Sequence, residues 1–269
     1  MEKLPIAVQI STRNAAKELQ ACIDSVSSWC SEIVVVDMES EDDTCEIARA
    51  NGATLVQVPA AGWAEPGRQA GVEAASQPWI FVLDVDERPG SELPQVAAEL
   101  IASDDLAGVW IAEQNFQFGW WVPNSGIWPD YHMRLFRRDR TTYPGDRLHV
   151  MAQVSGRTEH APARPECAIL HHSFPTISSW VKTVDKYSDL EAKHMDEAGR
   201  SASVFRLFAI PFARFFEQYI VKRGYRGGRY GLTIALLSFV SFLLGELKLW
   251  ERRLGLDTLP AGSIREPEA

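Results

Sequence analysis

The feature of this sequence that most constrains its fold is an alternation of short strand-like runs with segments of helical spacing in the first 84 residues. The strand-like runs span residues 6–10, 33–36, 53–58 and 79–83, and the helical segments span residues 15–29, 44–51 and 68–76. The last run is apolar at every position, which indicates a strand buried on both faces. Strands that alternate with helices of this length predict an α/β fold with a parallel-rich sheet flanked by helices.

Acidic side chains gather just after two of these strands. Asp37, Glu39, Glu41, Asp42 and Asp43 follow the second run, and Asp84, Asp86 and Glu87 follow the fourth. Ligands of open α/β sheets bind beyond the carboxyl ends of the strands, so these acids are expected near a ligand. Two carboxylates one residue apart repel each other unless a cation lies between them, and Mg²⁺ or Mn²⁺ carrying a diphosphate fits this arrangement. A simpler interpretation is that the acids cap the following helices or lie in turns.

Charge is unevenly distributed along the chain. The net charge is −9 at pH 7, with −14 over residues 1–129 and +6 over residues 130–230. A protein held to nucleic acid by bulk electrostatics needs clustered Lys and Arg, so we expect no nucleic-acid partner. An acidic first half followed by a basic middle predicts two surfaces with different partners.

The cysteines and the first residues indicate a compartment. Cys22, Cys30, Cys45 and Cys167 form no CxxC pair and are too few for a disulfide scaffold, so free thiols in a reducing compartment are expected. The first residues contain neither a long apolar core nor a small-residue cleavage site, and so do not resemble a signal peptide. We therefore expect a cytoplasmic protein.

The chain changes character after residue 200. Residues 200–230 hold seven basic side chains and one acid, Glu217, interleaved with aromatic residues. This mixture is typical of amphipathic helices on anionic lipid. The apolar run at residues 232–245 would form roughly 21 Å of helix against a hydrocarbon thickness of about 30 Å, so we expect it to lie in one leaflet. The alternative is a helical hairpin packed on the sheet or on a partner subunit.

Four segments at the expected strand ends occur in a characteristic order and spacing. They are residues 10–14 (ISTRN), 34–44 (VVVDMESEDDT), 67–71 (GRQAG) and 83–88 (LDVDER). In these segments the sequence resembles glycosyltransferase family 2. Later segments, at residues 131–138, 170–172, 186–188 and 224–232, are similar to the bacterial branch that includes lipopolysaccharide core glucosyltransferases. The resemblance extends over nearly the whole chain.

The resemblance implies a GT-A fold, a UDP-linked nucleotide-sugar donor, a divalent cation (Mn²⁺ or Mg²⁺) and transfer with inversion at the anomeric carbon. It implies that Thr12 contacts the donor base, that Asp37 hydrogen-bonds the base, and that Arg68 lies near the nucleotide. Asp84 matches the first acid of the family's DXD motif, which faces the ribose, and Asp86 matches the last, which binds the metal. These two acids together form the expected metal site. The metal would stabilise the charge that develops on the diphosphate leaving group.

The sequence departs from the family pattern in two places. Asn14-Ala15 replaces a common Asn-Glu pair in the first loop, which removes a carboxylate to which we assign no chemistry. His149-Val150 replaces a common His-Glu pair, in which the Glu lies where an inverting enzyme keeps its general base. An apolar side chain cannot accept the proton of the acceptor hydroxyl.

Three other residues are candidates for the general base. Asp146 follows a Pro-Gly turn and ranks first for its loop position, with a turn acid as the alternative. His149 ranks second because its ordinary pKa lies near neutral pH. Asp130 ranks third; it lies between Pro129 and Tyr131, where aromatic residues could stack on a sugar, and its alternative is again a turn acid.

Two further groups of residues have both a functional and a structural interpretation. The aromatic residues between residues 110 and 131 form either a platform for a glycan or lipid-linked acceptor or, more commonly, part of a core. His171 and His172 supply either an additional metal ligand or a structural pair at the end of an apolar run.

We therefore expect a metal-dependent inverting glycosyltransferase that acts on a lipid-linked or lipopolysaccharide-type acceptor, peripheral on the cytoplasmic face of the inner membrane. The expected organisation is a GT-A domain over residues 1–199, an amphipathic helical membrane-association segment over 200–255 and a flexible tail over 256–269. A nucleotidyltransferase is one alternative, although residues 11–14 are not a Gly-rich phosphate loop with a Lys. A catalytically silent, membrane-attached nucleotide-sugar-binding protein is another, and it would explain Val150.

Overall fold

The chain forms two compact units. The computed structural model describes residues 2–60, 65–121, 123, 128–143 and 151–255. Unit 1 comprises Met1–Phe116 and Trp128–Ser173, and unit 2 comprises Gln117–Ile127 and Phe174–Ala269. The domain boundary expected at residue 199 stays a prediction, and the expected tail lies outside the described residues.

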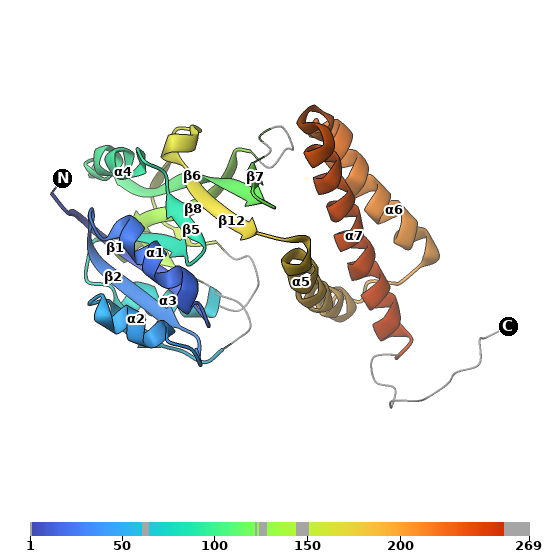
Figure 1. Cartoon of the computed structure of the whole chain (residues 1–269), viewed down its shortest axis with the longest axis horizontal. Helices are drawn as coiled ribbons and strands as arrows, with labels where there is room; N and C mark the ends of the chain where they lie inside the picture. The colour runs from blue at the N-terminus through green and yellow to red at the C-terminus, as the bar shows by residue number, and fades with distance from the viewer. Residues whose placement is uncertain (1, 61–64, 122, 124–127, 144–150, 256–269) are drawn as a thin grey trace. The chain divides into compact units, whose positions relative to one another are not determined.

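The first half of unit 1 is a parallel sheet with helices between its strands. The strands β1 (Leu4–Thr12), β2 (Cys30–Asp37), β3 (Thr54–Gln57) and β4 (Trp79–Asp84) lie in the order β3-β2-β1-β4 (Figure 1). The helices are α1 (Ala16–Val26), α2 (Thr44–Ala50), α3 (Glu65–Ala74) and α4 (Leu93–Ile101). Gly52, with φ of +70°, follows α2 in a left-handed conformation that favours glycine. The α/β fold with a parallel-rich sheet flanked by helices is thus confirmed.

The second half of unit 1 continues the same sheet in antiparallel pairing. β8 (Asp130–Arg137) pairs antiparallel with both β4 and β6 (Leu106–Gln117). Beyond β6 lie β12 (Ile169–Phe174) and β5 (Glu87–Pro89), and β11 (Arg157–His160) pairs parallel with β6. β9 (Thr141–Thr142) and β10 (Gln153–Val154) form a separate two-stranded sheet. The alternation of the first 84 residues did not indicate these antiparallel strands.

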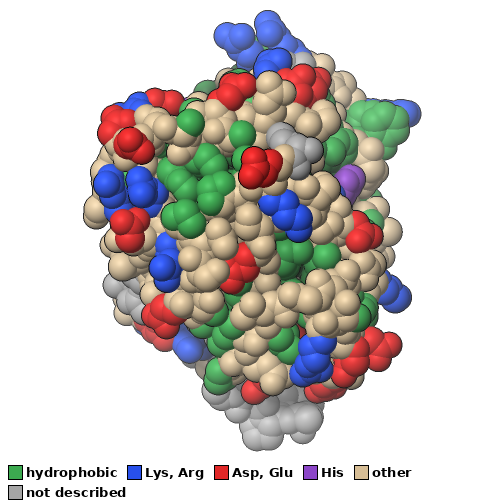
Figure 2. All heavy atoms as spheres, turned by 90° about the vertical axis from the view of Figure 1, so that its left-hand side faces the viewer, with side chains coloured by type: hydrophobic (Ala, Val, Ile, Leu, Met, Phe, Trp, Pro, Cys, Tyr) green, Lys and Arg blue, Asp and Glu red, His purple; other side chains and the backbone are tan. Residues whose placement is uncertain are grey.

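The surface of unit 1 mixes charges of both signs. Figure 2 shows acidic and basic side chains interspersed over one face, with small apolar areas between them. Glu39, Glu41 and Asp43, which follow β2, are exposed. The acidity of the first half is therefore largely carried by solvated side chains, and only selected acids lie inside.

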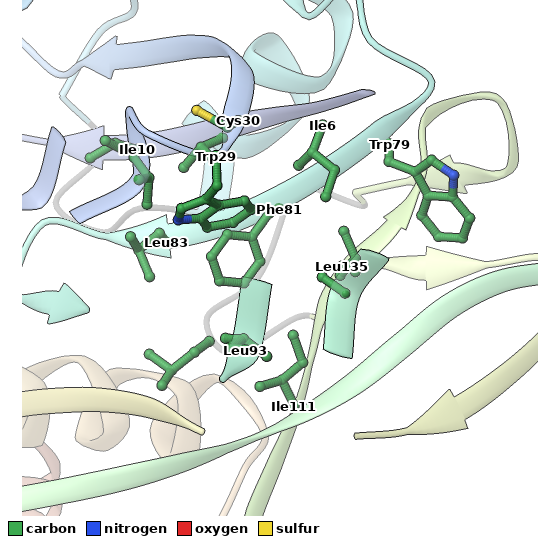
Figure 3. Close-up of a cluster of buried hydrophobic side chains, with 14 of the residues drawn as sticks. Ile6, Ile10, Trp29, Cys30, Trp79, Phe81, Leu83, Leu93, Ile111 and Leu135 are labelled. Carbon is green, nitrogen blue, oxygen red and sulfur yellow. The ribbon is translucent and has the colours of Figure 1, made fainter. Parts of the chain in front are cut away.

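The main core of unit 1 lies between β1, β4 and the helices on one side of the sheet. Alternate residues of neighbouring strands point into it, among them Ile6 and Ile10 of β1 and Phe81 of β4 (Figure 3). Trp29 packs on Phe81 with ring centroids 5.8 Å apart, and Leu93 begins α4 against the same cluster. Each fully buried side chain of this size contributes roughly 1.5–3 kcal/mol, so this cluster fixes the positions of the strand ends.

Unit 2 contains three long helices after a short strand, β7 (Trp120–Trp121). They are α5 (Ile177–Glu197), α6 (Val204–Phe216) and α7 (Gly228–Arg253). A π-helical turn (Glu217–Val221) and a 3₁₀ turn (Gly224–Gly227) connect α6 to α7, and these two helices lie side by side (Figure 1). Thr176 begins α5 with a capping box completed by Ser179.

The apolar run at residues 232–245 is only part of a longer helix. α7 has 26 residues, or roughly 39 Å at 1.5 Å per residue. Within the described part of the chain, the stretch Gly224–Arg253 is the one helix long and apolar enough to cross a membrane, and 28% of its apolar window is buried. The expectation that the helix is too short to span was wrong, because polar residues at both ends continue it.

Candidate active site

Three predicted site residues meet at the carboxyl edge of the parallel strands. Thr12 pairs with Asp37 across β1 and β2, and Ser11 pairs with Asp84 across β1 and β4. Thr12, Asp37 and Asp84 therefore end three adjacent strands, although they are far apart in the sequence. A parallel topology brings such positions to one edge, where α/β proteins bind their ligands.

Thr12 and Asp37 carry buried polar atoms that lack partners among the described residues. Asp37 is fully buried, and its Oδ2 accepts a hydrogen bond from the backbone N–H of Ser40 at 3.2 Å. Within the part of the chain that the structure describes, Asp37 Oδ1 and Thr12 Oγ1 have no hydrogen-bond partner. A buried polar atom without a partner costs about 1–3 kcal/mol. These two atoms point to a ligand that hydrogen-bonds at this end of the edge.

The loops after β1 and β2 hold each other in place. Asn14, with φ of +51°, receives the backbone N–H of Glu41 on its Oδ1 at 2.7 Å and donates its own N–H to Ser40 Oγ at 2.8 Å. Asp42 Oδ2 accepts the N–H of Ala16 at the start of α1, and its Oδ1 accepts the N–H of Thr44 at the start of α2. For Asp42 the simpler interpretation of the acidic run, helix capping, is therefore correct.

Asp84 is held by two arginines. Arg68 Nη2 lies 3.1 Å from Asp84 Oδ1, and Arg134 Nη1 lies 3.5 Å from Asp84 Oδ2. Burial opposes ionisation of Asp84, but the two guanidinium groups outweigh it and hold the pKa of this carboxyl below its ordinary value. Arg68, expected near the nucleotide, thus lies beside the first acid of the DXD motif.

Arg134 lies at the centre of a buried charge cluster that sequence reasoning missed. Its Nη2 lies 2.6 Å from Glu87 Oε1, and its Nε donates to Glu113 Oε1 at 3.0 Å. Burial raises the pKa of Glu87 to about 8. Glu113 is also buried, yet Arg134 holds its pKa well below the ordinary value. An acid within the otherwise apolar first part of β6 was the available signal for Glu113.

Asp86 faces a histidine from β12. His171 Nε2 lies 3.4 Å from Asp86 Oδ2, and its Nδ1 lies 3.7 Å from Glu113 Oε2. Burial opposes protonation of His171, but its hydrogen bonds to Asp86 and Glu113 raise its pKa to about 11. A carboxylate oxygen of Asp86, the last acid of the DXD motif, therefore lies beside an imidazole nitrogen of His171.

Asp130, the third candidate base, pairs with Glu113 across β8 and β6, so these two side chains lie on the same side of the sheet. Its Oδ1 lies 3.3 Å from His132 Nε2, and its Oδ2 accepts a hydrogen bond from Asn115 Nδ2 at 3.3 Å. The Oδ1 of the same Asn115 lies 2.8 Å from His171 Nδ1. Asn115 therefore links Asp130 to the histidine that faces Asp86.

Two sets of three side chains offer metal-ligand atoms within 4.8 Å of one another. They are Glu87, Glu113 and His171, and Glu113, Asp130 and His132. Both include Glu113, whose other oxygen binds Arg134. A cation held by Glu113 would compete with that guanidinium. The metal site expected at Asp84 and Asp86 stays a prediction.

The other two base candidates, Asp146 and His149, lie outside the described residues, as does Val150. They stay predictions.

The aromatic residues of this region are mostly packed. Trp110 stacks on His160 with centroids 6.0 Å apart, and Tyr131 meets the same ring edge-on and donates its hydroxyl to Ala161 O. His172 stacks on Phe116 at 5.1 Å. In unit 2, Trp120 stacks on Tyr230 with centroids 4.2 Å apart. These rings contact one another, yet every aromatic side chain of this group is partly or fully exposed, so both interpretations of the group stay predictions.

Comparison with known proteins identifies the family of this chain. The model of glycosyl transferase family 2 matches residues 7–155, which is more than half of the sequence. The chain belongs to glycosyltransferase family 2, and it is a glycosyltransferase.

Relatives of similar length agree with this assignment. The lipopolysaccharide core biosynthesis glycosyltransferase LpsC of Rhizobium meliloti is 29% identical over 264 residues and covers 93% of each chain. An uncharacterized glycosyltransferase of Rickettsia felis is 27% identical, covering 90% of this chain and 88% of its own. The mannosyltransferase PcManGT of Pyrobaculum calidifontis, solved with GDP-Man and Mn²⁺, matches with a TM-score of 0.56 and 13% identity over 93% of this chain and 88% of that chain. The last likeness concerns the fold alone, which agrees with the GT-A type of sheet.

Proposed function

We propose that the enzyme transfers a sugar from a UDP-linked donor, with inversion and with the help of a divalent cation, to a lipid-linked or lipopolysaccharide-type acceptor. The observation that carries this proposal is the carboxyl edge itself. Unpartnered buried polar atoms lie at Thr12 and Asp37, Asp84 ends the adjacent strand β4, and Asp86 follows it. The acceptor class rests on the likeness to LpsC, whose name refers to lipopolysaccharide core biosynthesis.

The donor base binds at Thr12 and Asp37 in this proposal. A nucleobase offers both N–H donors and carbonyl acceptors, so it can satisfy a carboxylate oxygen and a hydroxyl together. Asp84 would face the ribose, and Arg68 holds this carboxylate in place at 3.1 Å. Because Arg68 and Arg134 keep Asp84 ionised, it remains a hydrogen-bond acceptor at neutral pH.

A Mn²⁺ or Mg²⁺ ion would be held by Asp86 together with His171. Their facing atoms, Oδ2 and Nε2, are 3.4 Å apart, and carboxylate plus neutral imidazole is a suitable donor set for Mn²⁺. Because the pKa of His171 is raised to about 11, the ion would displace the proton that His171 carries at neutral pH. When bound, the ion supplies electrostatic stabilisation of the diphosphate leaving group. Asn115 would orient the imidazole from its other side, because its Oδ1 lies 2.8 Å from Nδ1 and can accept that N–H.

Asp130 is proposed as the general base among the described candidates. Its support is twofold: the carboxyl is 44% exposed, and Asn115 and His132 fix its two oxygens. An oriented, solvent-accessible carboxylate can accept the proton of an incoming hydroxyl. Asp146 and His149 remain the competing proposals.

We further propose that the protein is cytoplasmic and peripheral on the inner membrane, where a lipid-linked acceptor resides. An enzyme held at the surface meets such an acceptor at a higher effective concentration. The basic and aromatic residues of α6 and of the turn before α7 support this location.

The test is release of nucleoside diphosphate by the purified full chain from a panel of nucleotide sugars with Mn²⁺. We expect slow, sugar-selective release that excess chelator stops. For the transfer itself, NMR of the product from an α-linked donor should show a β-linkage. Release of pyrophosphate would indicate a nucleotidyltransferase, and binding of nucleoside diphosphate without any turnover would indicate a silent binding protein; either result contradicts the proposal.

A further inference from the structure

Unit 2 exposes a row of aromatic side chains on α6. Phe205, Phe208, Phe212 and Phe216 recur every three or four residues and so share one helix face. They are 78%, 61%, 58% and 57% exposed, respectively. Soluble proteins seldom expose an apolar surface of this kind unless it contacts a partner or a membrane. We call these four residues the phenylalanine row.

The phenylalanine row continues onto α7. Phe212 meets Phe239 of α7 edge-on, with centroids 5.1 Å apart. Leu232, Leu236 and Val240 follow one another at a spacing of four along α7 and are exposed. Residues 230–245 carry no charged side chain. The two helices therefore present a joint apolar surface.

Three of the seven cations at residues 200–230 are already paired within unit 2. Arg206 Nε donates to Glu246 Oε2 at 3.0 Å. Glu217 takes two further cations, with Arg214 Nη1 at 2.7 Å and Lys222 Nζ at 3.5 Å. Paired in this way, these side chains contribute less attraction to a charged surface than free cations would.

Unpaired cations remain in the turn between the two helices. Arg223 and Arg226 are exposed, and neither has an ion-pair partner among the residues that the structure describes. These two cations lie at one end of the α6–α7 hairpin, and residues 230–245 of α7 beyond them are uncharged.

We propose that the phenylalanine row seats α6 and α7 flat in the surface of an anionic bilayer, with the rings at the headgroup–acyl boundary and Arg223 and Arg226 among the phosphates. This rests on the membrane location in the proposed function and assigns it to a defined surface. Apolar contact then supplies most of the binding free energy, and the two arginines give a preference for anionic lipids.

A flat arrangement fits the contacts of α7 better than a membrane span does. A hairpin inserted turn first would carry Arg223 and Arg226 into the hydrocarbon, where charged side chains are costly. A span by α7 alone would expose Glu246 and Lys248 to lipid, although Arg206 of α6 and Asp185 of α5 hold them now. The free cations also favour an anionic headgroup layer over an uncharged protein partner.

The experiment is sedimentation of the full chain with phosphatidylcholine vesicles, with and without phosphatidylglycerol, at low and high salt. In the variant Phe205→Ser/Phe208→Ser/Phe216→Ser, partitioning should fall on the order of a hundredfold on both lipids. Phe212 stays in place because it contacts Phe239. High salt should weaken binding of the unmodified chain by less than about tenfold, since apolar contact is not screened.

Matched variants test whether the phenylalanine row itself is responsible for vesicle binding. Ile177→Ser/Val181→Ser removes exposed apolar side chains from α5 and should bind as the unmodified chain does. Leucine at positions 205, 208 and 216 should restore most of the binding. Arg223→Gln/Arg226→Gln should lose the preference for phosphatidylglycerol and keep its binding to phosphatidylcholine.

Several results would overturn the proposal. One is equal binding of the triple serine variant and the unmodified chain; another is an unmodified chain that stays in solution with every vesicle. A lipid-free dimer that the triple serine variant dissociates without losing vesicle binding would make the row a subunit interface. Nucleoside diphosphate release without lipid, measured on the same samples, should not change in the variants. If that release is absent in all samples, the proposed transferase function fails while the membrane result still stands.

Discussion

The two units depart in opposite directions from the usual partition of polar and apolar side chains. In unit 1, Asp37, Glu87 and Glu113 lie inside the protein, whereas in unit 2 the phenylalanine row lies outside. Buried polar groups without full satisfaction call for a small polar ligand, and an exposed apolar face calls for an extended apolar partner. The contrast separates the proposed donor site from the proposed membrane surface.

The ion pairs of the two units differ in the same way. Arg134 is 7% exposed and holds two buried acids, so its charge belongs to the interior of the sheet. Arg206 is 27% exposed and binds Glu246 between two helices. Removing Arg134 would leave two buried acids without their counter-ion, whereas removing Arg206 would leave one, Glu246, which is 5% exposed. Four predictions test this comparison, from the largest expected effect to the smallest.

Asp86→Ala should lower sugar transfer by at least about a thousandfold without unfolding the protein, because it removes the carboxylate expected to hold the metal. Transfer assays with Mn²⁺ and a thermal melt measure the two effects. Glu41→Ala, which removes an exposed acid from the same edge, should remain active. Substantial activity of Asp86→Ala, or full activity in excess chelator, contradicts a metal role for this residue.

Asp130→Asn should lower turnover by about 10²- to 10⁴-fold while donor binding changes little, because the amide cannot accept a proton. The kinetic comparison includes Asp146→Asn and His149→Gln on the same acceptor. Asp139→Asn is the control, since Asp139 is 68% exposed and follows β8. If Asp130→Asn keeps its turnover rate and one of the other two variants loses it, the residue changed in that variant is the general base.

Arg134→Gln should lower the free energy of unfolding by about 3–5 kcal/mol, because Glu87 and Glu113 lose their buried counter-ion. Arg206→Gln in unit 2 should cost less, because it leaves one buried acid, Glu246, without its counter-ion instead of two. Denaturant titrations followed by circular dichroism give both values. Equal losses for the two variants would remove the distinction drawn between the units.

The smallest effect concerns pH. The hydrogen bond to Asp130 raises the pKa of His132 above its ordinary value, against the effect of burial. A raised pKa stabilises the fold fully below the ordinary value of about 6.5, and this contribution is lost as pH rises through the folded value. His132 is 36% exposed, so we expect well under 1 kcal/mol.

Unfolding free energies measured between about pH 6 and pH 9 test this effect. His132→Gln should flatten the decline seen with the unmodified chain. His194→Gln, which alters an exposed residue of α5, should leave the profile unchanged. A profile of His132→Gln identical to that of the unmodified chain refutes the assignment.

Local patterns were enough to predict the parallel half of unit 1. The apolar runs that predicted strands over residues 6–10, 33–36 and 79–83 all lie in β1, β2 and β4, and the helix expected over residues 44–51 is α2. Apolar periodicity and strand-end acids involve residues that are close in the sequence, so they can be recognised without the structure. The same signals predicted Asp37 and Asp84 at one edge of the sheet, whereas Thr12 was predicted from the family resemblance.

The tertiary structure alone decided which side chains meet across the antiparallel half. Glu113, Asn115 and Arg134 lie on β6 and β8, and their meeting with Asp86 and His171 depends on strand pairing over long sequence distances. No local period encodes that register.

In unit 2 the sequence showed that basic, aromatic and apolar residues gather after residue 200, and composition determined that much. It did not show that Glu217 and Glu246 would neutralise Arg206, Arg214 and Lys222, nor that α7 would extend past its apolar run. Charge balance depends on which helix faces pack together, and helix length depends on caps and neighbours as well as on apolar content.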